Sequence, residues 1–500
     1  MMMRKLGLSL AAVLALGAQG VGAQGLPAET AARQAADTQL QNNINAEAAA
    51  RAAAEAALQN AIAAEAASRS AADTALGATD TQLQSQIDQL RNSIGSSGGT
   101  TSVDCGSGGS VNDALAAGAK KIIVRGRCNE SITVNQDDVT LQADPAGGEI
   151  HGPDAAANTV TVHGHRVTID GLTISGGRNG VSGVGSTNLN MRNCTVQSTG
   201  RTGIAYINNA GGSVDTCQVH SNPRDGIAAQ GGQVTVVNSM ITNNSRFGVI
   251  ILNGASANIG INDRQEPAGN TISQNGSYGI IVTTGGTAWI AMNQVTANGA
   301  DATMPGRSGI GIFQATANLV GGNTISDNPG TGITMTGATV TMGNGDVGIT
   351  PVNTITGNGN STSPGGVFAF LGSSVLMRNA SIQANHGPGL TLSTRSQAQV
   401  SGTTIQSNLD VPTPNGFVNA GDGIRLLLGS ALLPTGPNSI VSDNQGFGIQ
   451  CFDAESSVNG LPPIQAPNIP GMPPESVPVP PFTTMSGNGL GNVSGGCTGF

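Results

Sequence analysis

Apolar and polar residues follow two different periods along the chain, and the change of period divides it. Residues 24–94 are rich in Ala, Gln and Glu and contain very little Gly, a composition with strong helix propensity. The segment repeats every 18 residues, which is five turns of an α-helix. Arg33, Arg51 and Arg69 therefore share one angular position. This pattern predicts one long helix.

The same repeat places Leu and Ile residues on one narrow apolar stripe. An isolated helix of this kind buries almost no surface, so we interpret residues 24–94 as an oligomerising stalk. A homotrimer, associated as a coiled coil, is the expected assembly. The period of 3.6 lies between those that produce left-handed and right-handed supercoils, so associated helices should run nearly straight. A solvated spacer is the alternative, followed by a Gly/Ser linker at residues 95–102.

Beyond the linker the apolar period becomes that of short strands. A capped helix is expected over residues 110–117, and alternating apolar residues follow it. A Gly followed by Ile, Val or Leu then recurs, with shortest gaps of 22 or 23 residues, at Gly180, Gly203, Gly226, Gly248, Gly279, Gly309, Gly332, Gly366, Gly389, Gly423 and Gly448. An Asn three residues after an apolar residue recurs beside it, at Asn222, Asn244, Asn275, Asn298, Asn328 and Asn385.

One Asn turn and one Gly turn in each period indicate stacked, equivalent units. A single unit cannot bury a core. Units stacked at the strand spacing of about 4.8 Å would enclose columns of Ile and Val, and aligned Asn side chains could hydrogen-bond along the stack. Such a core needs few aromatic residues, in agreement with an aromatic content of 2%.

The segment Val167-Thr168-Ile169-Asp170-Gly171-Leu172 and the Asn and Gly-Ile repeats resemble those of pectate-lyase-like proteins. The resemblance covers about residues 103–455. It implies an all-β fold, a right-handed parallel β-helix built of coils of about 22–23 residues. Residues 456–500, which include a Pro-rich segment, are expected to form a C-terminal cap.

The resemblance does not select an activity, because this fold carries lyases, hydrolases, epimerases, tailspikes and non-catalytic surface proteins. The motif sets that mark polygalacturonases and alginate epimerases are not present in this sequence. No catalytic residue is therefore transferred from a family.

The N-terminus and the charge indicate where the protein acts. Arg4 and Lys5 precede an apolar run and small residues that end at Ala23, which predicts a signal peptide over residues 1–23. We expect an exported protein, in the periplasm, outside the cell or on its surface, without a membrane-spanning segment after cleavage. The net charge is −9 and no basic cluster is visible, which argues against nucleic acid as a partner.

Six cysteines in an exported chain make disulfides the default expectation. Two of them occupy equivalent positions one coil apart, where the expected Cα separation of about 4.8 Å suits a bridge. The other four flank the two ends of the repeats. Cys194–Cys217 is the expected bridge; a bridge between Cys105 and Cys128 would fasten the N-terminal end of the repeats and one between Cys451 and Cys497 the other end, but the sequence leaves the connectivity of these four open.

The densest charge is Asp263-Arg264-Gln265-Glu266, within an insertion between repeats. Asp263, Arg264 and Glu266 are weak candidates for acid–base catalysis, and a solvated loop is the simpler interpretation. Phe247 and Tyr278 precede the Gly of consecutive coils, so their rings could stack and contact a sugar. An ordinary turn-flanking stack is the simpler alternative.

No cofactor and no metal site are expected, because the alternating His163 and His165 lack an evident third ligand. We interpret the protein as a secreted or cell-surface module, non-catalytic, that is structural or contacts a polysaccharide. The ligand is expected on one flank that carries Phe247, Tyr278 and the charged insertion. A polysaccharide lyase or glycoside hydrolase and a tailspike-like trimeric fibre are the alternatives.

Overall fold

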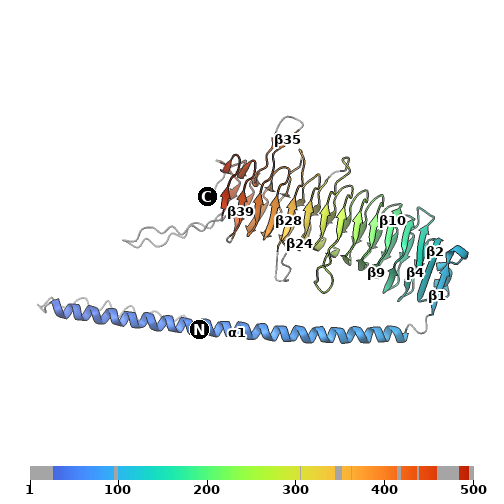
Figure 1. The fold of residues 1–500 in the computed structure, drawn as a ribbon, viewed down its shortest axis with the longest axis horizontal. Helices are drawn as coiled ribbons and strands as arrows, with labels where there is room; N and C mark the ends of the chain where they lie inside the picture. Colours follow the sequence, from blue (N-terminus) through green and yellow to red (C-terminus); the bar gives the residue numbers. More distant parts are fainter. Residues whose placement is uncertain are drawn as a thin grey trace. The chain divides into compact units, whose positions relative to one another are not determined.

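The chain forms two units, residues 1–94 and 95–500, drawn in Figure 1. The computed structural model describes residues 26–94, 99–304, 306–343, 352–361, 363–413, 418–435, 438–458 and 484–494. The expected signal peptide and Cys497 lie outside these residues, as does most of the Pro-rich segment. Within the described part, no helix is long and apolar enough to cross a membrane.

The first unit contains the predicted long helix, α1(Leu26–Ile94). Ion pairs join Arg33 to Glu29 and Arg69 to Glu65, at 2.6 and 2.9 Å. The equivalent pair Arg51–Glu47 stands between them, so the 18-residue repeat is visible on the helix surface. The apolar stripe is exposed in the single chain, and Leu58 shows 61% of its surface.

A short helical cap follows the first strand of the second unit, β1(Thr100–Asp104). The 3₁₀ turn η3(Cys105–Ser107) precedes α2(Val111–Ala116), where a helix was predicted. The side chain of Ser110 accepts a hydrogen bond from the N–H of Asp113 at 3.2 Å, and Glu130 accepts from the N–H of Val111 at 2.7 Å. The buried side of α2 therefore covers the first coil, as the open end of a solenoid requires.

Each regular coil contains three short strands, and each strand pairs in parallel with its equivalent in the next coil. In one coil these are β12(Gly211–Asp215), β13(Gln218–His220) and β14(Ile227–Gln230). Their partners are β15(Gln233–Val237), β16(Met240–Thr242) and β17(Val249–Leu252). The solenoid therefore has three faces, which we number in this order, and Figure 1 shows the stacked strands.

The first face consists of β1(Thr100–Asp104), β2(Lys121–Asn129), β4(Thr140–Gly152), β6(Val167–Asp170), β9(Asn188–Arg192), β12, β15, β18(Ser256–Ile259), β21(Thr287–Ala291), β24(Thr316–Gly321), β27(Thr339–Met342), β30(Ser374–Arg378), β33(Gln397–Ser401), β38(Ala431–Pro434) and β41(Ser457–Val458). The long strands β2 and β4 continue onto the second face, where β4 also pairs with β7.

The second face consists of β7(Thr173–Gly176), β10(Thr195–Thr199), β13, β16, β19(Thr271–Ser273), β22(Gln294–Thr296), β25(Thr324–Ser326), β28(Asn353–Thr356), β31(Ala380–Gln383), β34(Thr404–Gln406), β39(Ile440–Ser442) and β42(Thr484–Ser486). The third face consists of β3(Ile132–Val134), β5(Val160–Val162), β8(Val181–Val184), β11(Ile204–Ile207), β14, β17, β20(Ile280–Thr283), β23(Ile310–Phe313), β26(Ile333–Thr336), β29(Val367–Phe370), β32(Leu390–Leu392), β37(Ile424–Leu426), β40(Phe447–Cys451) and β43(Gly491–Val493).

The β-helix extends beyond both of its expected ends, residues 103 and 455. The first strand begins at Thr100, inside the expected linker. At the other end β42 pairs with β39 and β43 pairs with β40, so the solenoid extends past residue 455 into the expected cap. An insertion between β34 and β37 forms a small antiparallel hairpin, β35(Val411–Pro412) with β36(Val418–Asn419).

The predicted Asn turns form a continuous buried ladder between the second and third faces. Asn222 donates from Nδ2 to Oδ1 of Asn244 at 2.9 Å, and Asn244 donates to Asn275 at 3.0 Å. Each Nδ2 also reaches a strand carbonyl; that of Asn275 donates to Ile241 O at 3.0 Å. The ladder satisfies backbone groups that the solenoid interior hides from water. A second ladder at the corner between the first and second faces contains Asn270, Asn293, Asn323 and Asn353.

The predicted disulfide between Cys194 and Cys217 is wrong, because both thiols are free and buried. Cys194 Sγ donates to Arg192 O at 3.1 Å, and Cys217 Sγ donates to Asp215 O at 3.3 Å. Ser239 Oγ makes the equivalent bond in the next coil. In-register stacking places Cβ atoms about 4.8 Å apart, beyond the roughly 3.5–4.5 Å that a disulfide spans. The two thiols thus occupy the position that the Ser239 hydroxyl has in the next coil.

The predicted bridge between Cys105 and Cys128 is confirmed, with a Cα–Cα distance of 5.0 Å. It joins η3 to β2 beside the capping helix. Cys451 also takes part in a disulfide. Its pairing with Cys497 stays a prediction, since Cys497 lies outside the described residues.

Replacing Asn275 by Ala should lower the unfolding midpoint measured by circular dichroism. The change removes bonds to both neighbouring coils and leaves buried partners unpaired, at about 1–3 kcal/mol for each unsatisfied group. Asn318→Ala on the outer surface of β24 is the control and should leave the midpoint nearly unchanged. Equal midpoints for the two variants would show that the ladder does not stabilise the stack.

Cys194 and Cys217 should react with iodoacetamide only after denaturation, because both are buried. Mass spectrometry of the unreduced, denatured chain should find these two cysteines alkylated and Cys105 linked to Cys128. A peptide that links Cys194 to Cys217 would contradict the free thiols.

Candidate functional site

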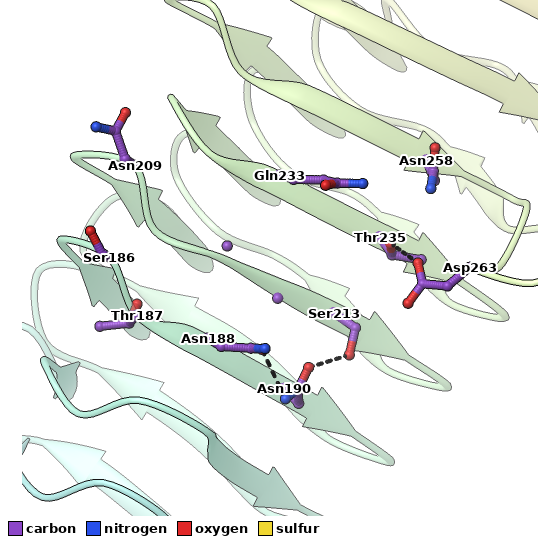
Figure 2. A pocket seen from close by; sticks show the side chains of 12 residues that line it. Ser186, Thr187, Asn188, Asn190, Asn209, Ser213, Gln233, Thr235, Asn258 and Asp263 are labelled. Carbon is purple, nitrogen blue, oxygen red and sulfur yellow. Dashed lines mark hydrogen bonds between the residues drawn. The ribbon is translucent and has the colours of Figure 1, made fainter. Parts of the chain in front are cut away.

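A polar groove of about 590 Å³ lies on the first face, over β9, β12, β15 and the start of the following coil. Part of its lining comes from alternate, outward-pointing strand positions and the rest from the adjoining turns, as Figure 2 shows. The lining residues are Ser186, Thr187, Asn188, Asn190, Asn209, Gly211, Gly212, Ser213, Gln233, Thr235, Asn258 and Asp263. All but Asp263 are uncharged.

Two glycines give the groove its depth. Gly211 stands in register with Asn188 and, on the other side, with Gln233, so a gap separates these two side chains. A Cβ on Gly211 would lie 2.6 Å from Gln233 O, and one on Gly212 would meet the backbone of Leu189. Gly212 also has a φ of 143°, a conformation that favours glycine. The floor is therefore bare backbone.

Hydrogen bonds within one strand and between neighbouring coils fix the polar side chains. Ser213 Oγ donates to Asn190 Oδ1 at 2.8 Å, and Asn190 Nδ2 donates to Asn188 Oδ1 at 3.1 Å. Thr235 Oγ1 donates to Asp263 Oδ1 at 2.9 Å. Figure 2 shows these residues pointing to the same side of the sheet. The groove thus presents an ordered set of amide and hydroxyl groups.

The strand register continues one row of the groove along the solenoid. Asn190, Ser213, Thr235 and Asn258 stand at equivalent positions of successive coils. Trp289 follows Asn258 in the same row, and its side chain is 39% exposed. An accessible indole therefore extends the polar row.

The two carboxylates of the charged insertion have different hydrogen-bond partners. Asp263 lies at the edge of the groove and accepts from Thr235. Glu266 Oε2 instead accepts from Asn262 Nδ2 at 2.8 Å, and the N–H groups of Arg264 and Glu266 donate to Asn262 Oδ1 at 3.0 and 2.9 Å. Glu266 and Arg264 thus belong to a tight turn with exposed side chains, the simpler of the two interpretations of this segment.

The rings of Phe247 and Tyr278 pack against each other at the corner between the second and third faces, with centroids 6.0 Å apart and the ring planes tilted by 54°. Phe313 meets the edge of Tyr278 at 5.6 Å. Tyr278 is only 8% exposed, and a Cβ on Gly311 would lie 2.8 Å from its ring. Burial raises the pKa of Tyr278 to about 12. Its ring is largely covered by the protein's own chain, and contact of Phe247 and Tyr278 with a sugar stays a prediction.

The residues expected on one ligand-binding flank lie on different parts of the solenoid. The two rings pack with Ile250 and Ile281, outward residues of the third face, whereas Asp263 contacts Thr235 on the first face. The sequence placed these residues in neighbouring coils correctly, but it did not separate the faces on which they lie. The groove amides and Trp289 were missed, although period-two alternation marks them as outward positions.

Cys105, Cys128 and Glu130 bring potential ligand atoms within 4.8 Å of one another. The two cysteines form a disulfide, and Glu130 accepts four hydrogen bonds from Ser110, Val111 and Asn112 at the start of α2. The two sulfur atoms are bonded to each other and the Glu130 carboxylate caps α2. These groups therefore do not suit a metal ion.

Three overlapping segments, residues 149–295, 229–344 and 306–460, match the family model described as right handed beta helix region. The chain belongs to this family. The match confirms the predicted right-handed parallel β-helix, while the family itself specifies no reaction. No curated protein matches the chain.

Three of the solved structures that match the chain do so at low sequence identity. Pectate lyase Pel9A is 13% identical, with 57% of this chain and 79% of that chain covered and a TM-score of 0.32. The A-module of mannuronan C-5 epimerase AlgE4 from Azotobacter vinelandii is 13% identical, with 72% and 91% covered and a TM-score of 0.36. The Dettilon tailspike protein is 11% identical, with 77% and 64% covered and a TM-score of 0.35. At these values no activity is transferred to this β-helix.

Proposed function

We propose that this β-helix is a non-catalytic module that contacts a polysaccharide through the groove of the first face. The observation that carries the proposal is the chemistry of the groove, where amides and hydroxyls surround a backbone floor. Asn, Gln, Ser and Thr side chains both donate and accept hydrogen bonds, which matches the hydroxyl groups of an uncharged sugar. Six of these side chains, those of Asn188, Asn190, Ser213, Gln233, Thr235 and Asn258, stand on strands, which hold them more rigidly than loops would.

The strand register suggests how the ligand lies. Outward residues of successive coils follow one another at about 4.8 Å along the solenoid axis. A sugar chain that runs along this axis would meet Asn190, Ser213, Thr235 and Asn258 in turn. Trp289 would then offer an aromatic surface to an apolar sugar face.

The carboxylates favour contact over cleavage. Glycoside hydrolysis uses two carboxyl groups about 5–9.5 Å apart, and Asp263 is the single carboxylate among the residues that line the groove. Asp263 also sits on an insertion and accepts a hydrogen bond from Thr235. A lyase or hydrolase, the alternative, would need a second acidic or basic group here.

We infer that the module acts outside the cytoplasm and is displayed on α1. The signal-peptide pattern of residues 1–23 supports export to the periplasm, the cell surface or the medium. The exposed stripe of α1, which includes Leu40, Leu58 and Leu76, supports association with two further copies of the helix. Burying this stripe between helices would remove apolar surface from water that the single chain leaves exposed.

The combined substitutions Asn190→Ala and Ser213→Ala should weaken binding to a neutral polysaccharide by roughly tenfold. Each lost hydrogen bond costs about 0.5–1.5 kcal/mol. Affinity electrophoresis across neutral polysaccharides would identify a ligand and measure the change, and Trp289→Ala should weaken the same ligand. Thr271→Ala on the second face is the matched control. Release of oligosaccharides by the unmodified protein, abolished by Asp263→Asn, would contradict a non-catalytic role.

The full chain should sediment as a trimer, and Leu58→Asp with Ile62→Asp should convert it to a monomer. The two carboxylates would have to be buried without partners at the centre of the helix interface. Gln59→Asp with Ala63→Asp adds the same charge about 100° around the helix and should preserve the trimer. A monomeric unmodified chain would exclude the stalk.

A further inference from the structure

Arginine occupies one repeated position in four consecutive coils. Arg178, Arg201, Arg224 and Arg246 each stand two residues before the Gly that begins a strand of the third face. We call these four residues the arginine column. The whole chain has only 21 Lys and Arg residues and a net charge of −9, so this is an unusual concentration of positive charge.

Backbone hydrogen bonds hold the turns of the column in register. The N–H of Arg224 donates to Arg201 O at 2.9 Å, and the N–H of Arg246 donates to Arg224 O at 2.8 Å. Gly200, next to Arg201, donates to Gly177, next to Arg178, at 2.7 Å. The arginines are therefore about one strand spacing, roughly 4.8 Å, apart along the solenoid axis.

One carboxylate stands within the column. Asp225 pairs with Arg246 at 2.6 Å and, more distantly, with Arg224 at 3.7 Å. No ion pair within 4 Å joins Arg178 or Arg201 to a carboxylate of the described residues, although the charge of Arg201 also acts on Asp225, where it works to lower the pKa of that carboxyl. Asp154, in the turn before Arg178, accepts instead from the N–H of Ala156 at 2.8 Å.

The column thus stacks four positive charges against one negative charge. Like charges at adjacent positions of neighbouring strands repel one another. The side chain of Arg178 is exposed and those of Arg201 and Arg224 are partly exposed, so an external anion can reach them. Arg246 is held in place by Asp225 and by the ring of Phe247, 4.4 Å from its guanidinium carbon.

We propose that the arginine column binds an acidic polysaccharide whose carboxylate or sulfate groups pair with successive guanidinium groups. The planar guanidinium fork matches both kinds of anion. The column runs along the solenoid axis, so an extended polymer can meet several arginines at once. This site goes beyond the groove, because it lies at the corner between the second and third faces.

Nucleic acid is the other polyanion that such a column could attract. Single strands are usually held by aromatic side chains on which the bases stack. Tyr278, next to the column, is covered by the protein's own chain. These observations favour the acidic polysaccharide.

The test compares binding of the full chain to polygalacturonate, dextran sulfate, neutral dextran and a single-stranded oligonucleotide. We expect binding to at least one acidic glycan at low salt, weakening as salt rises. Arg178→Ser with Arg201→Ser should reduce this binding roughly tenfold or more, as two charge-assisted contacts are lost. Arg178→Glu alone should also reduce it. A preference between the two acidic glycans would identify carboxylate or sulfate as the anion.

Arg125→Ser with Arg378→Ser is the matched control, since it removes the same charge from exposed positions outside the column. Equal binding of the column variant and this control, or no binding of either acidic glycan by the unmodified chain, would overturn the proposal. Tighter binding of the oligonucleotide would overturn the assignment to polysaccharide. The groove variant Asn190→Ala/Ser213→Ala should keep its affinity for the acidic glycan, and loss of that affinity would assign the binding to the groove instead. Failure of the groove to bind neutral sugars leaves the column intact.

Discussion

In-register parallel stacking is the constraint on which this β-helix depends. Each coil must turn three times, and the backbone N–H and C=O groups at these turns include groups that are hidden from water. Leaving such groups without a hydrogen bond is costly. The Asn ladder meets this need at one corner, because each side chain donates to the next Asn and to a strand carbonyl. Register is therefore set by side chains as well as by the strands.

In-register stacking makes residues that are one period apart in the sequence neighbours on the surface. Residues about 23 positions apart become neighbours, so each outward position extends into a row along the axis. On the first face the rows bring amides, hydroxyls and finally Trp289 together. At the corner before the third face the same rule stacks the arginines, and the backbone bond from Arg246 to Arg224 shows the contact directly. Function in this fold therefore depends on rows rather than on local motifs.

The sequence was sufficient to predict the repeating coils, but not which side chains lie together on each face of the solenoid. The Gly-Ile and Asn markers located the coils because glycine geometry and buried amides impose them on every repeat. The groove could not be found, since it depends on which residues of β9, β12 and β15 stand opposite one another, and on the gap at Gly211. The arginine column escaped a search for basic clusters for the same reason, because its members lie 22 or 23 residues apart.

The cysteine pair shows where reasoning from spacing alone goes wrong. Equivalent positions one coil apart do bring Cys194 and Cys217 together, but identical orientation keeps their Cβ atoms one strand spacing apart. Cys105 and Cys128 differ in this respect, since one belongs to a 3₁₀ turn and the other to a strand, and they are bridged. Parallel stacking thus favours side chains that can hydrogen-bond to the equivalent residue of the next coil. Asn does this with both ends of its amide, whereas a thiol or hydroxyl at the same position accepts from the N–H of the preceding coil and donates to a carbonyl, as Ser239 Oγ accepts from Cys217 N–H and donates to Val237 O.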